Sequence, residues 1–453
     1  MPRKLKRIMF AAGNMPGHTI YYVAADGNDN NSGLTKATPW LSIAKVNAAA
    51  TLPDGEVLFN GGDTFAGTLA PTRSGTPGHP ITYGSYGTGA RPVIDGTGGN
   101  CAFYIADNYH DLRFEHLDFK YSTGAYSTIY CYDAHDIYFY DCIMRDAGAR
   151  HGISINKSAH TVYNITVDSC ELKDNYLSGT YTGSLTSYNI LFKNCVAHNN
   201  GHSVDGDHGF YVAGGVTLDN CTAYSNSGGG FKMNDNENEP SNYPIVKNCI
   251  SYSNNYGIIF THKNALAYNN LVYSSLTANV LMYGNTWGGY KCYFNTLVNA
   301  VSASYRGSFM FAGGFSPTSD IRNNLCIQDA AVVSKGNLHF DVGLGMSSYD
   351  DVMDYNVYYY SSTNPTTQHI IYSTLDVGAE LKDWVEWRAA GGEPHGTMLT
   401  TTPDFVTRYT DLHPADAGDL KGKGVAIAGY ELDKDGNTRA NPPTPGCYEE
   451  AAA

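Results

Sequence analysis

One short phrase returns along this chain at an almost constant interval. Each copy has a Cys that follows Asp, Ser or Asn and opens a short, partly apolar segment, as in Asn-Cys-Val-Ala at 194–197. Successive copies lie 25 to 28 residues apart, at Cys142, Cys170, Cys195, Cys221 and Cys249. Because self-similarity at this period indicates a solenoid, one such Cys is expected in each structural repeat. We therefore predict a stacked column of buried free thiols and not a set of disulfides.

The repeat extends beyond these cysteines in both directions. It reaches back to His-Leu-Asp-Phe at 116–119 and forward to Tyr-Asn-Val-Tyr-Tyr at 355–359. A second phrase recurs out of phase, as His-Gly-Phe-Tyr-Val at 208–212 and Gly-Gly-Phe-Lys-Met at 229–233. Short alternating segments bounded by Gly and Asn are typical of strands, and no helical period intervenes. Several short strands in each of about ten or more turns predict an all-β fold, a parallel β-helix.

The two ends depart from the repeat and divide the chain. We expect an N-terminal arm at 1–18, an N-terminal cap with the first turns at 19–99, β-helix repeats at 100–360, and a C-terminal cap and tail at 361–453. Thr38, Pro39 and the apolar spacing up to Val46 predict a capping helix with Thr38 as its N-cap. A second short helix is predicted from Leu381 to Ala390.

Charge and apolar runs restrict the possible partners. The chain of 453 residues has a formal net charge of −14, and phosphate binding needs a basic surface, so nucleic acid is excluded as a partner. No apolar run is long enough to span a membrane. The basic N-terminus is followed by too short an apolar stretch for a clear signal peptide. We expect an extracellular protein, or a virion component whose partners include other virion or cell-surface proteins.

The order of several segments resembles the start of the right-handed parallel β-helix proteins of the pectate-lyase superfamily. These segments are Tyr21 to Asp29, Thr38 to Trp40, Val57 to Phe65 and Pro80 to Tyr83. The tail at 402–406, together with Asp433 to Arg439, resembles the ending of the same group. The resemblance covers most of the chain and implies a right-handed coil. This fold hosts lyases, hydrolases, epimerases and structural parts, so the function must come from a site.

One outward-facing column of the predicted coil carries the densest polar surroundings. Alternate strand residues point outward, and those of successive turns align, which gives the column Ser154, Tyr181, Tyr211, Lys232 and Ile259. Adjoining segments add Asp205, Asp207, His208, Asn234, Asp235, Glu237, Glu239, His262 and Lys263. Tyrosine rings can stack on sugars. We expect a polysaccharide to contact Tyr181, Tyr211, Asn234, His262 and Lys263.

The phrase Gly230-Phe231-Lys232 resembles the catalytic-lysine segment of family 9 pectate lyases. This resemblance implies that Lys232 removes the proton beside a carboxylate, in β-elimination on a uronic-acid polymer. The segment from Asp205 to Phe210 resembles the calcium-binding segment of that family, which implies Ca²⁺ ligands at Asp205 and Asp207. The family has a further turn with paired aspartates between these segments, and this chain lacks it. Asp235 or Glu237 would be the substitute ligand.

Two other functions stay open at this point. In a glycoside hydrolase, paired carboxylates such as Asp205 and Asp207 would do the acid and base work, with His208 beside them. A virion component of the tailspike type would bind glycan or provide a rigid shaft. His208 has a counterpart at His151, and this symmetry favours a structural turn role at least as strongly as a catalytic one.

Overall fold

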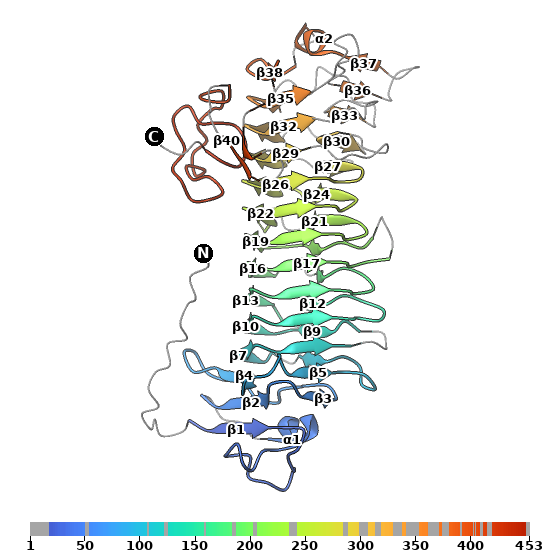
Figure 1. Ribbon diagram of the computed structural model, residues 1–453, viewed down its shortest axis with the longest axis vertical. Coiled ribbons are helices and arrows are strands. Elements are labelled where there is room, and N and C mark those ends of the chain that lie inside the picture. Colours follow the sequence, from blue (N-terminus) through green and yellow to red (C-terminus); the bar gives the residue numbers. More distant parts are fainter. Residues whose placement is uncertain are drawn as a thin grey trace.

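The computed structural model describes residues 18–449 except for short segments. The segments left out are 50–53, 107, 122–125, 158–159, 184–186, 203–205, 235–241, 284–288, 299–306, 313–318, 329–337, 341–352, 361–370, 374–379, 390–391, 402, 404, 408–410 and 415–418. The described strands stack turn on turn along one axis and form three long sheets (Figure 1). Neither described helix has the length and apolarity that a membrane-spanning helix needs.

Sheet A has 13 strands and runs the length of the coil. Its strands are β1 (Ile20–Val23), β2 (Glu56–Asn60), β4 (Ile81–Tyr86), β7 (His110–Glu115), β10 (His135–Tyr140), β13 (Tyr163–Asp168), β16 (Tyr188–Lys193), β19 (Val216–Asp219), β22 (Ile245–Lys247), β25 (Leu266–Tyr268), β28 (Lys291–Tyr293), β31 (Asp320–Arg322) and β34 (Met353–Asp354).

Sheet B also has 13 strands. Over most of the coil, each of them follows a strand of sheet A after a short turn. They are β3 (Thr64–Ala66), β5 (Val93–Asp95), β8 (Asp118–Lys120), β11 (Ile143–Arg145), β14 (Glu171–Lys173), β17 (Val196–His198), β20 (Thr222–Tyr224), β23 (Ile250–Tyr252), β26 (Leu271–Tyr273), β29 (Thr296–Val298), β32 (Leu325–Gln328), β35 (Val357–Tyr360) and β38 (Thr397–Leu399).

Sheet C has 12 strands and completes the coil. They are β6 (Phe103–Ile105), β9 (Ile129–Tyr132), β12 (Ile153–Asn156), β15 (Thr180–Thr182), β18 (Phe210–Val212), β21 (Gly229–Met233), β24 (Tyr256–Phe260), β27 (Ala278–Tyr283), β30 (Phe309–Ala312), β33 (Leu338–Phe340), β36 (Ile371–Ser373) and β37 (Glu380–Lys382). Neighbouring strands in the three sheets are parallel except for β36 and β37, and β39 (Phe405–Thr407) pairs antiparallel with β40 (Asp411–Pro414). The predicted all-β parallel β-helix is therefore confirmed.

The turn from sheet A to sheet B explains the repeated cysteine phrase. The residue before each column Cys has a positive φ, for example 56° at Asn194, a conformation that Asn and Asp tolerate better than most side chains. The five cysteines are free and buried, as predicted. Each thiol donates to main-chain carbonyls, as Cys195 Sγ does to the oxygens of Val167 and Lys193, both at 3.3 Å.

The same column changes from thiols to amides further along the coil. The backbone N–H of Cys249 donates to Asn270 Oδ1 at 2.9 Å, and the column continues through Asn295, Asn324 and Asn356. A second amide column occupies the turn from sheet B to sheet C, with side-chain bonds of 2.8 to 3.0 Å along Asn175, Asn200, Asn226 and Asn254. It explains the glycine in the second phrase, since a Cβ on Gly209 would lie 2.9 Å from Asn226 Nδ2.

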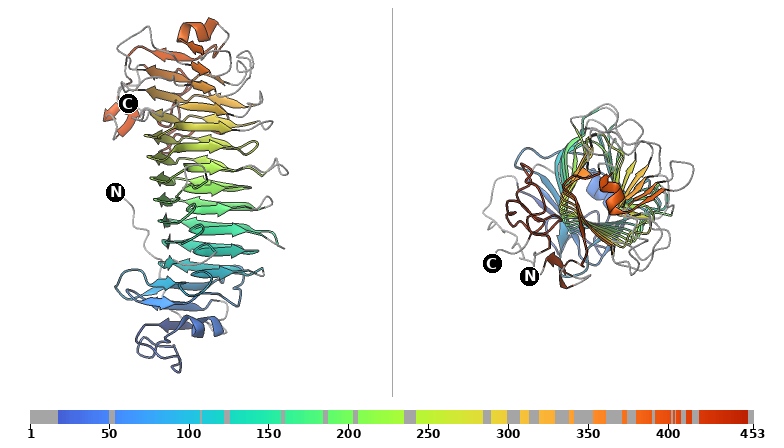
Figure 2. Two further views of the ribbon diagram at one scale, coloured as in Figure 1. Left: turned by 90° about the vertical axis from the view of Figure 1, so that its right-hand side faces the viewer. Right: turned by 90° about the horizontal axis from the view of Figure 1, so that it is seen from above.

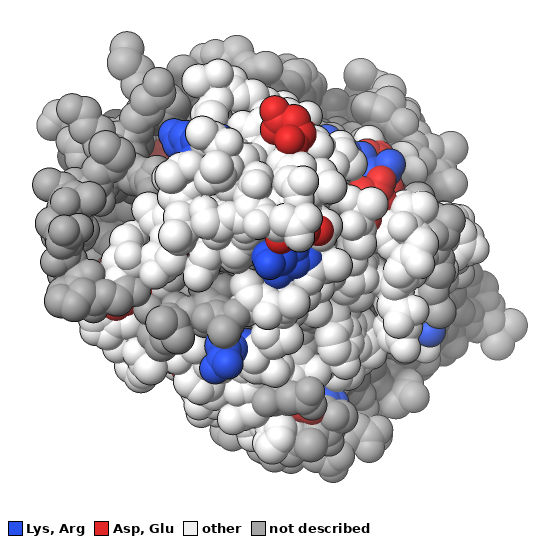
Figure 3. Space-filling view, turned by 90° about the horizontal axis from the view of Figure 1, so that it is seen from below, with Lys and Arg blue, Asp and Glu red and all other residues white. Residues whose placement is uncertain are grey.

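A short helix, α1 (Ile43–Ala48), lies at the N-terminal end of the coil and buries Ile43 and Val46 in the main core. Its N-cap is Ser42, whose Oγ accepts from the N–H of Lys45 at 3.1 Å. The predicted start with Thr38 as N-cap is therefore wrong. The reason is that Trp40 pairs with Val23 as a β-bridge, which keeps this stretch out of the helix. Seen from this end, the described surface shows charged side chains only in a few separate places (Figure 3).

At the other end, α2 (Trp384–Ala389) lies over the last turns (Figure 2). It is shorter than the predicted helix because residues 380–382 form β37. Just beyond it, Glu393 is wholly buried and ends the amide column, where its Oε2 accepts from Asn356 Nδ2 at 3.2 Å and its Oε1 accepts from the hydroxyl of Tyr358.

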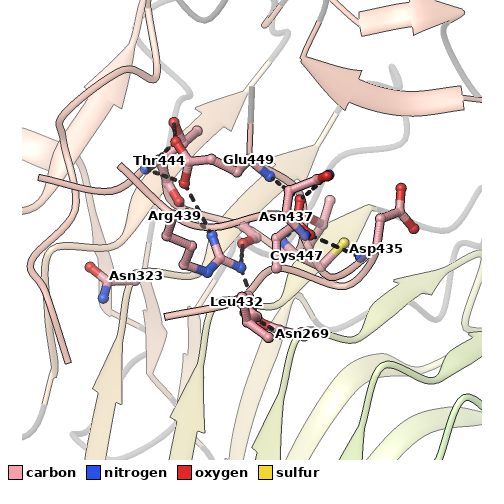
Figure 4. A network of polar contacts seen from close by, with 12 residues as sticks. Asn269, Asn323, Leu432, Asp435, Asn437, Arg439, Thr444, Cys447 and Glu449 are labelled. Atoms are coloured by element: carbon pink, nitrogen blue, oxygen red, sulfur yellow. Dashed lines mark hydrogen bonds and ion pairs between the residues drawn. The ribbon is translucent and has the colours of Figure 1, made fainter. Parts of the chain in front are cut away.

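The C-terminal tail folds back along the side of the coil, beside β26 to β35 (Figure 1). Leu420, Cys447 and Tyr448 pack on apolar residues of the outer face of sheet B, which are Leu271, Val298, Leu325, Ile327 and Val357. Arg439 anchors this segment from a buried position (Figure 4). Its guanidinium donates to Asn269 Oδ1 at 3.0 Å, lies 3.5 Å from Glu449 Oε2, and covers the ring of Phe294.

Candidate functional site

The predicted outward column exists as a row on sheet C. The strand register aligns Ser154 with Tyr181, Tyr181 with Tyr211, Tyr211 with Lys232, and Lys232 with Ile259. Tyr181 and Tyr211 stack with ring centroids 5.3 Å apart. The Nζ of Lys232 lies 5.0 Å from the centroid of the Tyr211 ring, a cation–π contact. The row thus brings together an ammonium group and two aromatic rings on one face.

Lys232 is partly buried in this row. On its far side, Ile259 is an apolar register neighbour with 5% exposure. Burial lowers the pKa of Lys232 below the ordinary lysine value, because desolvation disfavours the charged form. Nearby carboxylates would raise this pKa, and a bound cation would lower it. Among the described residues, burial is the cause of the shift and no carboxylate contributes to it.

Tyr211 and Asn234 lie together beside Lys232. The phenol of Tyr211 is in hydrogen-bond contact with the side chain of Asn234, which lowers its pKa. Burial outweighs that effect, and with Tyr181 it raises the pKa of Tyr211 to about 12. Tyr211 is therefore a neutral hydroxyl at physiological pH. Of the predicted polysaccharide contacts, Tyr211 adjoins Lys232, Asn234 contacts Tyr211, and Tyr181 lies one strand further along the row.

His208 belongs to a column of side chains that accept backbone N–H groups. His151 donates its N–H to Ser127 Oγ at 3.3 Å, and its own Nδ1 accepts from Ser178 at 3.2 Å. Ser178 Oγ accepts from His208 at 2.9 Å, and His208 Nδ1 accepts from Gly229 at 2.7 Å. The pKa of His208 is lowered to about 3, mainly by burial and further by the charges of Lys232 and His151, so its ring is neutral. With 1% exposure, this ring serves the turn and offers no surface to a ligand.

The carboxylate of Asp207 also has hydrogen-bond partners within the fold. Its side chain is 4% exposed, and Oδ2 accepts from the backbone N–H of His202 at 3.0 Å and lies 3.0 Å from His202 Nδ1. The left-handed φ of 91° at Gly201 permits this approach, since a Cβ there would meet Asp207 Cβ at 2.3 Å. Asp207 therefore orients an imidazole, a partner that the sequence did not reveal.

The remaining predicted residues do not join the row. His262 is wholly buried, and its Nδ1 lies 2.5 Å from the carbonyl oxygen of Lys263. Lys263 follows it in the turn after β24 and is partly exposed. Asp205 and Asp235 lie outside the described residues, as do Glu237 and Glu239. Their placement therefore stays a prediction.

The expected Ca²⁺ does not fit the donors that are described. Calcium takes six to eight oxygen ligands, usually with several carboxylates. The buried carboxylate of Asp207 is engaged by His202, and no group of three or more His, Cys, Asp or Glu within the described residues is arranged to hold a metal ion. The calcium expectation thus depends on Asp205 and Asp235.

A shallow depression lies at the turn from sheet B to sheet C and was not predicted. Its volume is about 390 Å³, and its lining includes Asp146, Asp174, Tyr176, Asn199, Gly201 and His202. The ring of Tyr176 stacks on that of His202 with centroids 3.9 Å apart. A signal was present, because Asp146, Asp174 and Asn199 occupy one position of three successive repeats, each with positive φ.

Comparison with known proteins agrees with this architecture. A family model described as a right-handed β-helix region matches residues 127–297, and no curated protein sequence matches the chain. The pectate lyase Pel9A has a TM-score of 0.53 at 15% identity, with 97% of this chain and 98% of that chain covered.

Two further solved structures are longer than this chain. The family 6 alginate lyase AlyGC has a TM-score of 0.54 at 10% identity, with 96% of this chain and 60% of that chain covered. A GH136 lacto-N-biosidase from Eubacterium ramulus has a TM-score of 0.49 at 16% identity, with 84% of this chain and 66% of that chain covered. Likenesses at these identities concern the fold. The chain therefore contains a right-handed β-helix region and shares its overall fold with the two lyase structures.

Proposed function

We propose that this protein acts on an extracellular polysaccharide, by β-elimination on a uronic-acid polymer with Lys232 as the base. The observation that carries the proposal is the partly buried Lys232 beside Tyr211, on the outward face of a long sheet. Burial increases the fraction of neutral amine at a given pH, and only the neutral amine can accept a proton. Structural neighbours that are named pectate lyase and alginate lyase support the same class.

The reaction needs few groups from the protein. Lys232 Nζ takes the proton from the carbon beside the uronate carboxylate. The released electron pair forms a carbon–carbon double bond, and the bond to the glycosidic oxygen breaks. Water protonates the departing oxygen. The resulting lysine ammonium then lies near the carboxylate, where positive charge stabilises the anionic intermediate. Tyr181 and Tyr211 offer aromatic surface to the sugar rings.

The test uses a panel of uronic-acid polymers, with polygalacturonate and alginate among them. We expect ultraviolet absorbance from unsaturated products with the wild type, and none with Lys232→Ala. The matched control is Lys291→Ala, since Lys291 is an exposed lysine on sheet A. Parallel reactions with a chelator test the calcium expectation at Asp205 and Asp235. Loss of activity in Lys291→Ala, or full activity in Lys232→Ala, would rule out this role for Lys232.

The second candidate function is a glycan-binding or structural β-helix, such as a virion component of the tailspike type. The stacked pair Tyr181–Tyr211 favours it, because such rings bind sugars without chemistry. Binding without any unsaturated or reducing-end product across the panel would identify this function. The glycoside hydrolase receives no such support, since Asp207 is buried in its contact with His202.

A further inference from the structure

The stacked rings of Tyr176 and His202 form a half-exposed aromatic surface that the proposed lyase chemistry does not use. Tyr176 is 46% exposed and the His202 side chain is 50% exposed, although their rings stack at 3.9 Å. The orientation of the His202 ring is fixed by a neighbouring side chain. Here the fixing group is Asp207, almost wholly buried beneath His202.

The hydrogen bonds of His202 determine which ring nitrogen is left to accept a hydrogen bond from a ligand. Nδ1 lies 3.0 Å from Asp207 Oδ2 and 3.1 Å from the carbonyl oxygen of Tyr176, so the ring proton belongs on Nδ1. Nε2 of the neutral ring is then an acceptor. The backbone just before His202 is also held in place. The N–H of Gly201 donates to the carbonyl oxygen of Asn175 at 2.9 Å, and its carbonyl oxygen accepts from Ser227 Oγ at 2.8 Å. The imidazole is therefore pre-oriented.

The other polar groups of the depression decide which ligand suits it. Asp146 and Asp174 add carboxylate acceptors, and Asn199 adds an amide. Arg145 Nη1 binds Asp146 Oδ2 at 2.6 Å and so partly offsets one of the two charges, whereas Asp174 is exposed. A surface rich in acceptors beside an aromatic ring suits the hydroxyl groups and apolar faces of a neutral sugar. The same carboxylates would repel a uronate.

We propose that the depression lined by Tyr176 and His202 is a second saccharide site, which binds uncharged sugar units and is separate from the Lys232 row. The sugar stacks on Tyr176, and its hydroxyls donate to Asp146, Asp174 and His202 Nε2. The same turns carry both sites, since β14 and β15 flank Tyr176 while β17 and β18 flank His202 and Asp207. The protein is thus suited to a heteropolysaccharide that contains neutral as well as acidic units.

The experiment is affinity electrophoresis of the full chain in gels that contain one soluble polysaccharide each: arabinoxylan, galactomannan, xyloglucan or polygalacturonate. We expect at least one neutral polymer to slow the wild type. Tyr176→Ala and His202→Ala should bind that polymer about tenfold more weakly, whereas Tyr176→Trp should retain binding. The matched control is Tyr188→Ala, because Tyr188 is also 46% exposed and also stacks on a neighbouring ring, that of Tyr163.

The outcomes separate this site from the lyase proposal. Neutral-polymer binding that persists in Lys232→Ala, which loses β-elimination, supports two sites. If no neutral polymer slows the wild type, or if Tyr176→Ala migrates like the wild type and Tyr188→Ala, the second site is refuted. Equal melting temperatures of Tyr176→Ala and the wild type show that weaker binding does not come from unfolding. Absence of elimination on every uronate polymer would refute the lyase proposal alone.

Discussion

His208 and Gly229 are joined across successive turns of the coil, because Nδ1 of the histidine accepts the backbone N–H of the glycine at 2.7 Å. Ser178 does the same for His208 through its hydroxyl, at 2.9 Å. Serine and histidine therefore serve as equivalent acceptors in this column. A catalytic role was one interpretation of His208 from the sequence, and this bond gives the residue a structural one.

Replacement of His208 by two smaller residues distinguishes these roles. His208→Ser keeps an acceptor for Gly229, as Ser178 shows, so it should retain any activity with a modest loss of stability. His208→Ala leaves a buried N–H without a partner and should lower the free energy of unfolding by a further ~1–3 kcal/mol. Urea unfolding and an activity assay of both variants check this. A His208→Ser protein that is folded and inactive would instead favour catalysis.

The pH dependence of activity should depend on Tyr211. Its ring lies against Lys232 and contributes to the burial that lowers the lysine pKa. In Tyr211→Ala, water reaches the amine and this pKa rises towards the ordinary value. The alkaline rise of kcat/KM should therefore move to higher pH in Tyr211→Ala. Tyr211→Phe keeps the ring and should retain the wild-type profile, although it loses the contact with Asn234. Identical profiles in all three proteins would exclude Lys232 as the titrating base.

Sequence periodicity predicted the outward row correctly, for a physical reason. Strand residues alternate between two faces, so one inward residue such as Phe210 determines the orientation of Tyr211, and the repeat carries that orientation to Lys232. The contact between Asp207 and His202 could not be predicted in this way. It depends on the path of a turn that departs from the repeat, where the absence of a Cβ at Gly201 leaves room for the side chain of Asp207. The bridge of Trp40 to Val23 likewise overrode a good local helix signal.

The junction between the thiol and amide columns gives a matched pair of variants. Cys249 adjoins Asn270, so the side chain of Cys249→Asn can extend the amide column by one bond. Cys195 lies between Cys170 and Cys221, so the amide of Cys195→Asn can reach the Val167 carbonyl but meets a thiol in place of an amide on each neighbouring turn. We expect Cys249→Asn to change stability by less than ~1 kcal/mol and Cys195→Asn to lose ~1–3 kcal/mol. Thermal unfolding under reducing conditions measures both, and equal losses would contradict this account.

Glu393 should make stability depend on pH. Burial is the largest cause that raises its pKa, to about 8 from the ordinary 4.5, although Tyr358 and Asn356 act against it. The folded protein then holds a proton that the unfolded chain releases. Its contribution to stability is present below about pH 4.5 and is lost as pH rises towards 8. At about 1.4 kcal/mol per pKa unit, the loss amounts to several kcal/mol.

The variant Glu393→Gln removes this titration while it keeps an amide acceptor at the end of the column. We expect the wild type to lose stability between pH 5 and 8 and Glu393→Gln to lose much less, so that the variant is the more stable protein at pH 8. Urea unfolding at both pH values measures the difference. The control is Glu431→Gln, at an exposed glutamate in the tail. A wild type whose stability rises over this window while that of Glu393→Gln does not would contradict the assignment.

Arg439 should hold several turns together through the C-terminal tail. Solenoid repeats contact only their neighbours, so a segment that crosses many turns adds contacts that the coil itself lacks. The tail bonds to successive turns at Asn269, Thr296 and Asn323, and the Arg439–Glu449 pair is buried at its centre. In Arg439→Met, the carboxylate of Glu449 stays buried without its cation, at a cost of about 3–5 kcal/mol.

Hydrogen exchange locates this effect. In Arg439→Met we expect faster exchange in β25 to β32, which the tail covers, and unchanged exchange in β7 to β16, which it does not reach. Arg439→Met combined with Glu449→Gln removes both charges and should recover part of the lost protection. If exchange accelerates equally along the whole coil, the turns unfold as one unit, and the tail does not stabilise the turns beside it separately from the others. If it does not change at all, the buried pair contributes nothing to holding the tail in place.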